Sequence, residues 1–258
     1  MKILNIEKYP FYEIAYISSS RRGPVRHCRL PFYKVLVDTL PDGISAIAVT
    51  SDLQGREGGE ANRLLGEVVS EELRLLADVG DIPHVNGVIL AGDMYDYPDC
   101  HKLGGSGDVT DVWNAFANDF EHVIGVHGNH DMVDEDVLFA SVHVLDGDCV
   151  DAMGLSIAGV SGIIGSPHRN QRKSEADFKK NLQRVLTKKT DMIVLHQGPD
   201  DPETGRIGEP LVREALENKG SGMVIFGHCP WQDPYAEIGD HQVLNVDGRV
   251  MLLVTQNE

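Results

Sequence analysis

The sequence predicts an α/β protein in which two packed mixed β-sheets are flanked by helices. Five short apolar runs have the composition of buried strands and each ends in a polar residue, while segments with helical spacing lie between them. The segments before Asp52 and after His228 are rich in β-forming residues, which favours two packed sheets over one doubly wound sheet. A chain of 258 residues, of which 41% are hydrophobic, can bury such a core without needing disulfides for stability.

The predicted elements follow one another along the chain with Gly and Pro at the turns. Helices are expected at 60–79 and 174–188, the second with Ser174 as its N-cap and Asp177 in a capping-box-like position. The expected strands cover residues 14–17, 33–37, 44–50, 88–91, 123–126, 192–195, 223–226, 242–247 and 250–254. No repeat or low-complexity linker interrupts this order, so we expect a single domain over residues 1–258. Residues 1–43 are expected to form a β-rich N-terminal extension outside the motif-bearing core.

Charge and cysteine content disfavour several classes of protein. There are 23 Lys and Arg against 40 Asp and Glu, so the net charge is −17 and most of the surface repels phosphate backbones. The four cysteines lie far apart without a C-x-x-C pair, which indicates reduced thiols, and no apolar run approaches 18 residues. We therefore expect a cytoplasmic protein that binds neither duplex nucleic acid nor a membrane. The oligomeric state stays open.

The polar residues at the strand ends are candidate metal ligands. Loops at the carboxyl ends of strands in open α/β sheets project side chains into one crevice, so these residues can converge. Taken singly, Asp52 and Asp93 could instead cap the helices that follow them. Together the residues mix hard oxygen donors with imidazoles, which suits Mn²⁺, Fe²⁺, Zn²⁺ or Ni²⁺ better than Ca²⁺. They are Asp52, Asp93, Asn129, His130, His196 and His228.

Five short blocks around these residues resemble, in order, the five motifs of the calcineurin-like metallophosphoesterases. The resemblance spans about residues 44–230, and GNHD together with GD-x-x-D is the specific combination. It implies a metallophosphoesterase-like four-layer sandwich and an enzyme that hydrolyses a phosphomonoester or phosphodiester with a metal-activated hydroxide. The blocks are Ser51 to Gly55 (SDLQG), Gly92 to Asp96 (GDMYD), Gly128 to Asp131 (GNHD), His196, and Gly227 to Pro230 (GHCP).

The resemblance also implies a role for each residue. One or two divalent transition metal ions (Mn, Fe, Zn or Ni) are expected, with the Asp93 carboxylate as the bridge between two. One ion would be completed by Asn129, His196 and His228, and the other by Asp52 and Gln54. His130 would hydrogen-bond the phosphate or the leaving group, oriented by a carboxylate such as Asp96 or Asp131.

Two departures from the family pattern affect the same ion. Gln54 and Pro230 stand where the family usually has histidines, and proline has no ligating side chain. Cys229 or His241 could substitute, although nothing in the spacing favours either. An alternative function is therefore a degenerate family member that has one strong metal site and binds a phosphorylated ligand with little turnover. A nuclease is a further alternative, which the acidic composition disfavours.

Basic residues near the motifs are candidates for binding the substrate, which we expect to be a phosphorylated small molecule or a short nucleotide. They are Arg56 and the cluster at 168–173 that contains Arg169. The cluster could equally be a solvated approach to the following helix. A cap over the crevice is expected from the N-terminus and residues 142–173.

Overall fold

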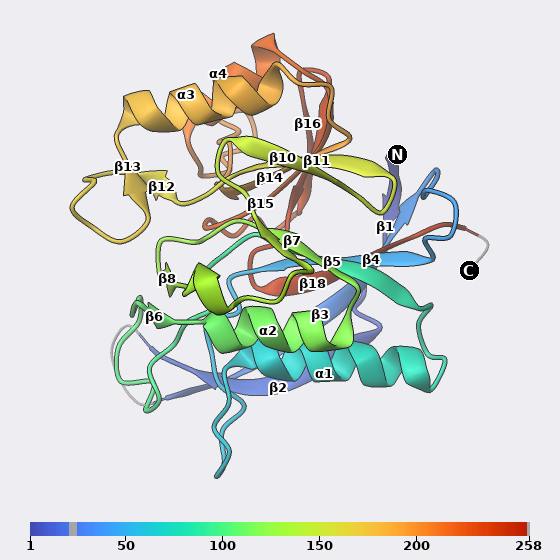
Figure 1. The fold of residues 1–258 in the computed structure, drawn as a ribbon, viewed down its shortest axis with the longest axis vertical. Coiled ribbons are helices and arrows are strands. Elements are labelled where there is room, and N and C mark those ends of the chain that lie inside the picture. Colours follow the sequence, from blue (N-terminus) through green and yellow to red (C-terminus); the bar gives the residue numbers. More distant parts are fainter. Residues whose placement is uncertain (21–24, 257–258) are drawn as a thin grey trace.

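A computed structural model describes residues 1–20 and 25–256 and contains two large sheets that pack face to face (Figure 1). The strand order of the first sheet is β1-β3-β18-β4-β5-β7-β9, and β2 pairs with β3. Its strands are β1 (Ile3–Ile6), β2 (Tyr12–Ser18), β3 (Arg26–Val37), β4 (Ala46–Ser51), β5 (Val85–Leu90), β7 (His122–Gly125), β9 (Val142–Val144) and β18 (Arg249–Val254). The first 43 residues thus supply three strands at one side of this sheet.

The second sheet has the order β10-β11-β14-β15-β17-β16. Its strands are β10 (Asp148–Ala152), β11 (Leu155–Val160), β14 (Met192–Gln197), β15 (Gly222–Gly227), β16 (Tyr235–Ile238) and β17 (His241–Asn245). Two short pairs lie outside the large sheets: β6 (Gly107–Asp108) with β8 (Asp131–Met132), and β12 (Ile163–Ile164) with β13 (Arg172–Lys173).

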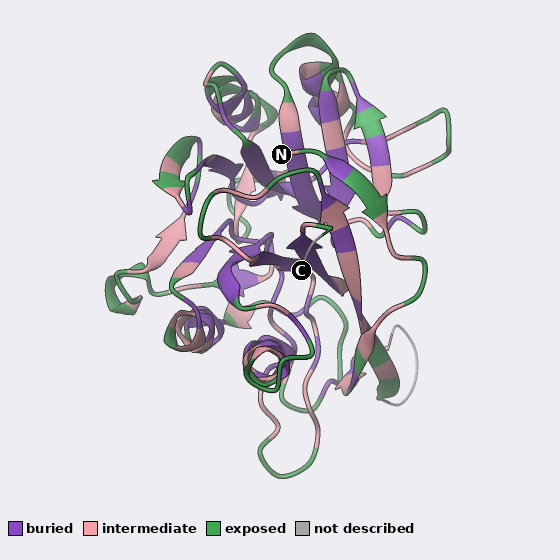
Figure 2. Cartoon of the chain, turned by 90° about the vertical axis from the view of Figure 1, so that its right-hand side faces the viewer, coloured by how far each residue is buried: buried purple, intermediate pink, exposed green. Residues whose placement is uncertain are grey.

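Helices cover the outer face of each sheet, which gives four layers. Helices α1 (Leu65–Asp78) and α2 (Thr110–Asp119) share a core with the first sheet, and α3 (Glu175–Leu186) and α4 (Pro210–Asn218) share one with the second. A third core, which includes Val49 and Ile225, fills the space between the sheets. Figure 2 shows buried residues along the middle of the sandwich and exposed ones at its rim. The predicted fold class is confirmed.

Local sequence explains the main elements. All six residues of β4 and of β5 are buried, because each strand lies between neighbours in its sheet and is covered on both faces, and most of their residues are accordingly apolar. Helix α1 buries Leu65, Val69 and Leu73 on one stripe. Helix α3 begins after Ser174, whose hydroxyl accepts the Asp177 N–H at 3.1 Å, as the sequence predicts.

Two expectations about local structure are wrong, and two helices were not predicted. The first helix begins at Leu65 and not at residue 60, because Asn62 has a φ of 48° and the segment before it is tied into a loop by Arg56. Residues 142–160 form β9, β10 and β11, so they belong to the two sheets and form no cap. Helices α2 and α4 were not predicted, and α3 ends at Leu186, two residues short of the predicted end.

All four cysteines are free. Among the helices of the described residues, none combines the length and the apolar character that a membrane crossing needs.

Candidate metal centre

The polar residues that end five strands meet at one edge of the sandwich. Strands β4, β5 and β7 run parallel in the first sheet, and β14 and β15 run parallel in the second, so the carboxyl ends of each set lie together. Two hydrogen bonds join the two sets. His196 Nδ1 donates to the Ala91 carbonyl at 2.7 Å, and the His228 N–H donates to Asp52 Oδ2 at 2.8 Å.

Asp93, His196 and His228 form a compact group of possible metal ligands, because one ligand atom from each lies within 4.8 Å of the other two. Asn129 Oδ1 and His196 Nε2 are buried and have no hydrogen-bond partner among the described residues. Because Nδ1 of His196 donates to Ala91, Nε2 is the ring nitrogen that faces Asp93 Oδ2, at 3.3 Å, and that becomes available to a metal once its proton leaves. One carboxylate, one amide oxygen and two imidazoles therefore fit a divalent transition metal ion.

The backbone is strained at three of the candidate ligands. The φ angle is 55° at Asp52, 58° at Asp93 and 69° at His228, in the left-handed region that residues other than glycine rarely adopt. Gly128 permits the loop that follows β7 to pass beside Asp93, because a Cβ at this position would collide with the Asp93 carboxylate. Such strain persists only where the surrounding contacts enforce it, and it is typical of functional sites.

The other half of the predicted centre has fewer donors. Asp52 Oδ2 also accepts a hydrogen bond from the Ser51 hydroxyl at 2.7 Å. Gln54 Nε2 lies 3.5 Å from Asp93 Oδ2, so the amide is next to the predicted bridging carboxylate. Pro230 contributes no ligand, and the half-centre retains two carboxylates and one amide from the residues that the motifs identify.

His130 lies at the mouth of the centre, with 21% of its side chain exposed. Its N–H donates to Asp93 Oδ1 at 2.8 Å, and its Nε2 is 3.9 Å from Asp93 Oδ2. Its Nδ1 lies 3.3 Å from the Ser106 hydroxyl, within hydrogen-bond distance. Ser106, in the loop before β6, is therefore the residue within hydrogen-bond distance of this ring nitrogen.

The two carboxylates that the sequence proposes as orienting partners of His130 are engaged elsewhere. Asp131 is fully buried and accepts the N–H groups of Asp93 at 2.7 Å, Met94 at 2.8 Å and Gly128 at 2.8 Å. Asp131 thus ties the second and third motif loops together. Asp96 accepts hydrogen bonds from the Ser18 and Ser19 hydroxyls and from the N–H groups of Ser19 and Tyr97, which anchors the end of β2.

The two arginines proposed for substrate binding differ in their surroundings. Arg56 donates from Nε and Nη2 to the Asp96 carbonyl, at 3.1 and 2.8 Å, and from Nη1 to the Asn62 carbonyl at 2.8 Å. This geometry favours a role in holding loops over a role in binding substrate. Arg169 lies in the loop between β12 and β13, where neighbouring Asn170 donates to the Asp131 carbonyl at 2.8 Å. This loop therefore rests on the third motif.

Arg172 and Asp247 also lie near the centre, although the sequence does not single them out. Burial lowers the pKa of His228 and the positive charge of Arg172 adds to this, whereas burial raises the pKa of Asp52 and the negative charge of Asp247 adds to that. Arg172 is one member of the predicted basic cluster, and Asp247 is the last residue of a predicted strand. Neither residue belongs to one of the five motifs, so the sequence offers no other reason to select it.

The charges at the centre shift the pKa values of its imidazoles in opposite directions. Burial lowers the pKa of His196, but the charges of Asp93 and Asp52 outweigh burial and raise it to about 10. Burial and the charge of His196 lower the pKa of His228 to about 4. Burial raises the pKa of Asp93, yet His196 and His130 outweigh it and hold that pKa below its usual range.

Fold and site together define a metal-dependent hydrolase of phosphate esters. The family model of the calcineurin-like phosphoesterases matches residues 45–231, well over half of the chain, and the protein belongs to this family. The match covers all five motif blocks and begins two residues after the β-rich N-terminal segment. The predicted family and enzyme class are confirmed, and a comparison with curated proteins finds no match.

Similar solved structures include a phosphopantetheinyl hydrolase from Mycobacterium tuberculosis, with 13% identity, a TM-score of 0.45, and coverage of 80% of this chain and 90% of that one. A hypothetical protein from Thermus thermophilus has 13% identity, a TM-score of 0.41 and coverage of 78% and 75%. A 5'-nucleotidase from Candida albicans has 14% identity, a TM-score of 0.40 and coverage of 80% and 46%.

Metal binding at this centre should release a proton. With a pKa of about 10, His196 is protonated at pH 7.5 in the ion-free protein, whereas a metal ligand must be neutral, and His228 with a pKa of about 4 is neutral already. We expect release of about one proton per ion and an affinity that rises about tenfold per pH unit between pH 6.5 and 9. Calorimetry in two buffers of different ionisation enthalpy measures the release. A proton count of zero would contradict the charge assignment.

Replacing Asp131 should damage the fold before it affects chemistry. Asp131→Asn presents an NH₂ group to buried N–H donors, so we expect a loss of about 1–3 kcal/mol in the free energy of unfolding, together with weaker metal binding. Urea denaturation measures this loss, and Asp136→Asn, at an exposed position in the 3₁₀ turn Glu135–Val137, is the matched control. If Asp131→Asn left the stability unchanged but altered the pH profile of kcat, the role of Asp131 in orienting His130 would be supported instead.

Proposed function

We propose that this protein hydrolyses the phosphomonoester or phosphodiester of a small molecule or a short nucleotide at the centre around Asp93. The observation that carries the proposal is the compact group formed by Asp93, His196 and His228 beside the buried oxygen of Asn129. The net charge of −17 disfavours long polyanions as substrates, because a protein with this excess of acidic groups repels them.

Each candidate ligand has a place in this proposal. Divalent ions bound at the centre supply an activated water and neutralise charge on the phosphoryl group. Asn129, His196 and His228 would hold one ion, and Asp52 and Gln54 the other, with the Asp93 carboxylate shared. The fixed tautomer of His196 and the strained turns preorganise these donors, so that little rearrangement is needed on binding.

His130 is the proposed proton donor to the leaving group. Its Nδ1 is within hydrogen-bond reach of Ser106, while Nε2 lies 3.9 Å from Asp93 Oδ2 at the open side of the centre. A protonated Nε2 can hydrogen-bond the phosphoryl oxygen and then transfer its proton to the departing oxygen. Arg172, half-buried in β13 after the loop that contacts the third motif, is the cation proposed to attract the phosphate charge.

A second candidate function is ligand binding with little turnover at one strong site. Gln54 and Pro230 are the observations that favour it, because they remove two imidazoles from the half-centre around Asp52. The two functions differ in turnover. Hydrolysis of para-nitrophenyl phosphate and of its bis ester under Mn²⁺, Ni²⁺, Zn²⁺ and Fe²⁺ separates them, and absence of hydrolysis with every metal, despite bound metal, would favour the second.

Asp93→Asn should abolish both metal binding and hydrolysis. The substitution keeps the shape of the side chain but removes the charge that faces His196 at 3.3 Å, and a bridging ligand must be anionic to offset two dications. Metal content by mass spectrometry and hydrolysis of both nitrophenyl esters measure the effect, with exposed Asp81→Asn as the control. Near-normal metal content in Asp93→Asn would contradict the shared-ligand role.

His130→Ala should retain metal while kcat falls by roughly 10²- to 10⁴-fold, the range for loss of a positioned proton donor. The backbone N–H of residue 130, which bonds Asp93 Oδ1, is preserved in this variant. Metal content and kcat are compared with those of His84→Ala, an exposed histidine before β5. Loss of metal together with activity would instead make His130 a ligand.

A further inference from the structure

A glycine-rich loop, residues 104–107 (GGSG), lies against His130 although it belongs to none of the five motifs. Backbone hydrogen bonds hold the end of this loop in place. The Gly107 N–H donates to the His130 carbonyl at 3.1 Å, and the Val109 N–H donates to the Met132 carbonyl at 2.9 Å. These bonds belong to the parallel pair of β6 with β8. The loop is therefore fixed relative to the backbone of His130.

The glycines allow this loop to pack closely on two tyrosines that follow β5. A Cβ at Gly105 would collide with the Tyr97 ring, and a Cβ at Gly107 would collide with the Tyr95 ring. The two tyrosine rings pack edge to face, with their centroids 5.6 Å apart. Larger residues at these positions would push the loop away from the tyrosines, so the glycines permit the position that brings the loop to His130.

Ser106 is the one residue of this loop that has a side chain, and its hydroxyl lies beside the His130 ring. The hydroxyl oxygen is 3.3 Å from Nδ1 and is the only hydrogen-bond partner of the ring within residues 1–20 and 25–256. On the other side of the ring, Nε2 faces Asp93 Oδ2 at 3.9 Å. A Cβ at Gly104 would lie 3.4 Å from the ring carbon Cε1, so the loop also contacts the edge of the ring.

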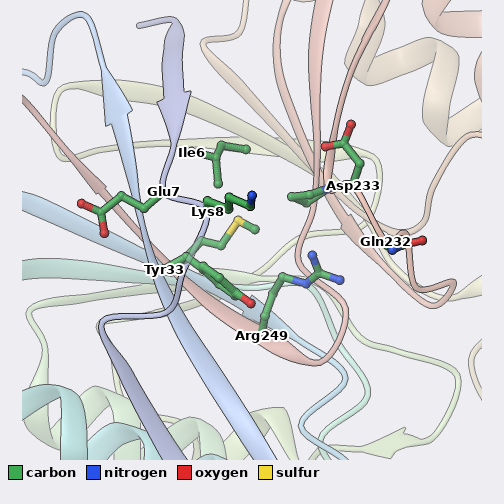
Figure 3. A pocket seen from close by; sticks show the side chains of 9 residues that line it. Ile6, Glu7, Lys8, Tyr33, Gln232, Asp233 and Arg249 are labelled. Carbon is green, nitrogen blue, oxygen red and sulfur yellow. The ribbon is translucent and has the colours of Figure 1, made fainter.

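A cavity of about 320 Å³ offers no alternative partner for this ring (Figure 3). It is lined by residues of β3 and β18 and by the segment before β16, and Lys8, Tyr33 and Arg249 supply polar groups to it. No residue of the five motifs or of the loop 104–107 lines it. The group that holds the His130 ring therefore comes from the glycine-rich loop.

We propose that Ser106 is a positioning residue for hydrolysis, which holds the His130 ring so that Nε2 faces the leaving oxygen of the phosphate ester. The inference rests on the proposed function, because it requires His130 as the proton donor. In the protonated ring, Nδ1–H donates to the Ser106 oxygen, and Nε2–H carries the proton that is transferred.

The contact to Ser106 is compatible with the whole transfer step. When the bond between phosphorus and the leaving oxygen breaks, its electron pair stays with that oxygen, which takes the proton from Nε2 of His130. The ring becomes neutral and keeps its other proton on Nδ1. Because a hydroxyl oxygen accepts that proton before and after the transfer, the bond to Ser106 persists and the ring does not have to turn.

A hydroxyl also fits the charge of this region better than a carboxylate. Asp96 and Asp131, the partners that the sequence suggests, are occupied by other donors. Ser106 accepts the Nδ1 proton without a further negative charge next to Asp93 and the phosphate, which would repel it. The loop therefore supplies a neutral acceptor where a carboxylate was expected.

The test is steady-state hydrolysis of phenyl and para-nitrophenyl phosphate esters by the metal-loaded protein, as monoester or diester according to which one it hydrolyses. Phenolate is the poorer leaving group, so its departure depends more on a proton donor. The variants are Ser106→Ala, Ser106→Thr, His130→Ala and the double variant with alanine at both positions. Ser221→Ala, at an exposed position before β15, is the control that loses the same hydroxyl. Thermal melting and metal content verify that each variant folds and keeps its centre.

Ser106→Ala should lower kcat for the phenyl ester by roughly 2- to 12-fold, the effect of one neutral hydrogen bond, and leave KM and metal content unchanged. The loss should be smaller for the para-nitrophenyl ester. Ser106→Thr keeps the hydroxyl and should retain most of the activity, and Ser221→Ala should match the unmodified protein. In the His130→Ala background, Ser106→Ala should have no further effect, because no ring is left to hold.

Three results would overturn the inference and leave the proposed function standing, given that His130→Ala loses activity. They are an unchanged kcat in Ser106→Ala, an equal loss for both esters, and the same loss with and without His130. Full activity of His130→Ala would overturn the proposed proton donor and the inference with it. Absence of hydrolysis by the unmodified protein with every metal would overturn both the inference and the proposed function.

Discussion

Burial of the Asp93 carboxylate where the two sheets meet is the constraint on which the rest of the centre depends. The residue is 2% exposed, and a buried carboxylate is costly unless cations and hydrogen-bond donors surround it. The second sheet supplies His196 at 3.3 Å, and the third motif loop supplies the His130 N–H at 2.8 Å. Asp131, itself buried, fixes the backbone of Asp93 and of the loop that approaches it. The third motif is thus a structural clamp as well as a source of donors.

The centre also links the two halves of the sandwich. Asp52 and Asp93 come from the first sheet, and His196 and His228 come from the second, so an ion bound among them cross-links sheets that otherwise adhere through an apolar core. Binding energy at the centre is therefore also folding energy, since the unfolded chain has no such site. The left-handed turns at three of these residues are a cost that the same binding offsets.

The sequence predicted the parts of the molecule that repeat a simple pattern. Strands β4, β5, β14 and β15 each contain a continuous apolar run. A polar residue directly after such a run marks the end of the strand, whatever position the strand has in its sheet. Ser174 could be recognised as a cap because capping is local. Residues 142–160 were misplaced, because β9 and β10 are short, partly exposed strands at the sheet edges that carry little periodic signal, and the buried strand β11 directly follows them.

The roles assigned to Asp96 and Asp131 were wrong, because tertiary contacts determine which groups these carboxylates hydrogen-bond. Asp131 and Asp96 are the last residues of the third and second motifs, which suggested an interaction with His130, but the three N–H groups around Asp131 come from two loops that only the fold brings together. Asp247 lies 195 residues after Asp52 in the sequence, and their proximity follows from the pairing of β4 with β18. Such neighbours have no spacing rule that a single sequence can reveal.

The most direct test of the central claim is a crystal structure of the protein soaked in Mn²⁺, with anomalous difference density used to locate the ions. The account predicts a strong peak about 2.0–2.3 Å from a carboxylate oxygen of Asp93, from Asn129 Oδ1 and from a ring nitrogen each of His196 and His228. A strong peak elsewhere, with none touching Asp93, would contradict it.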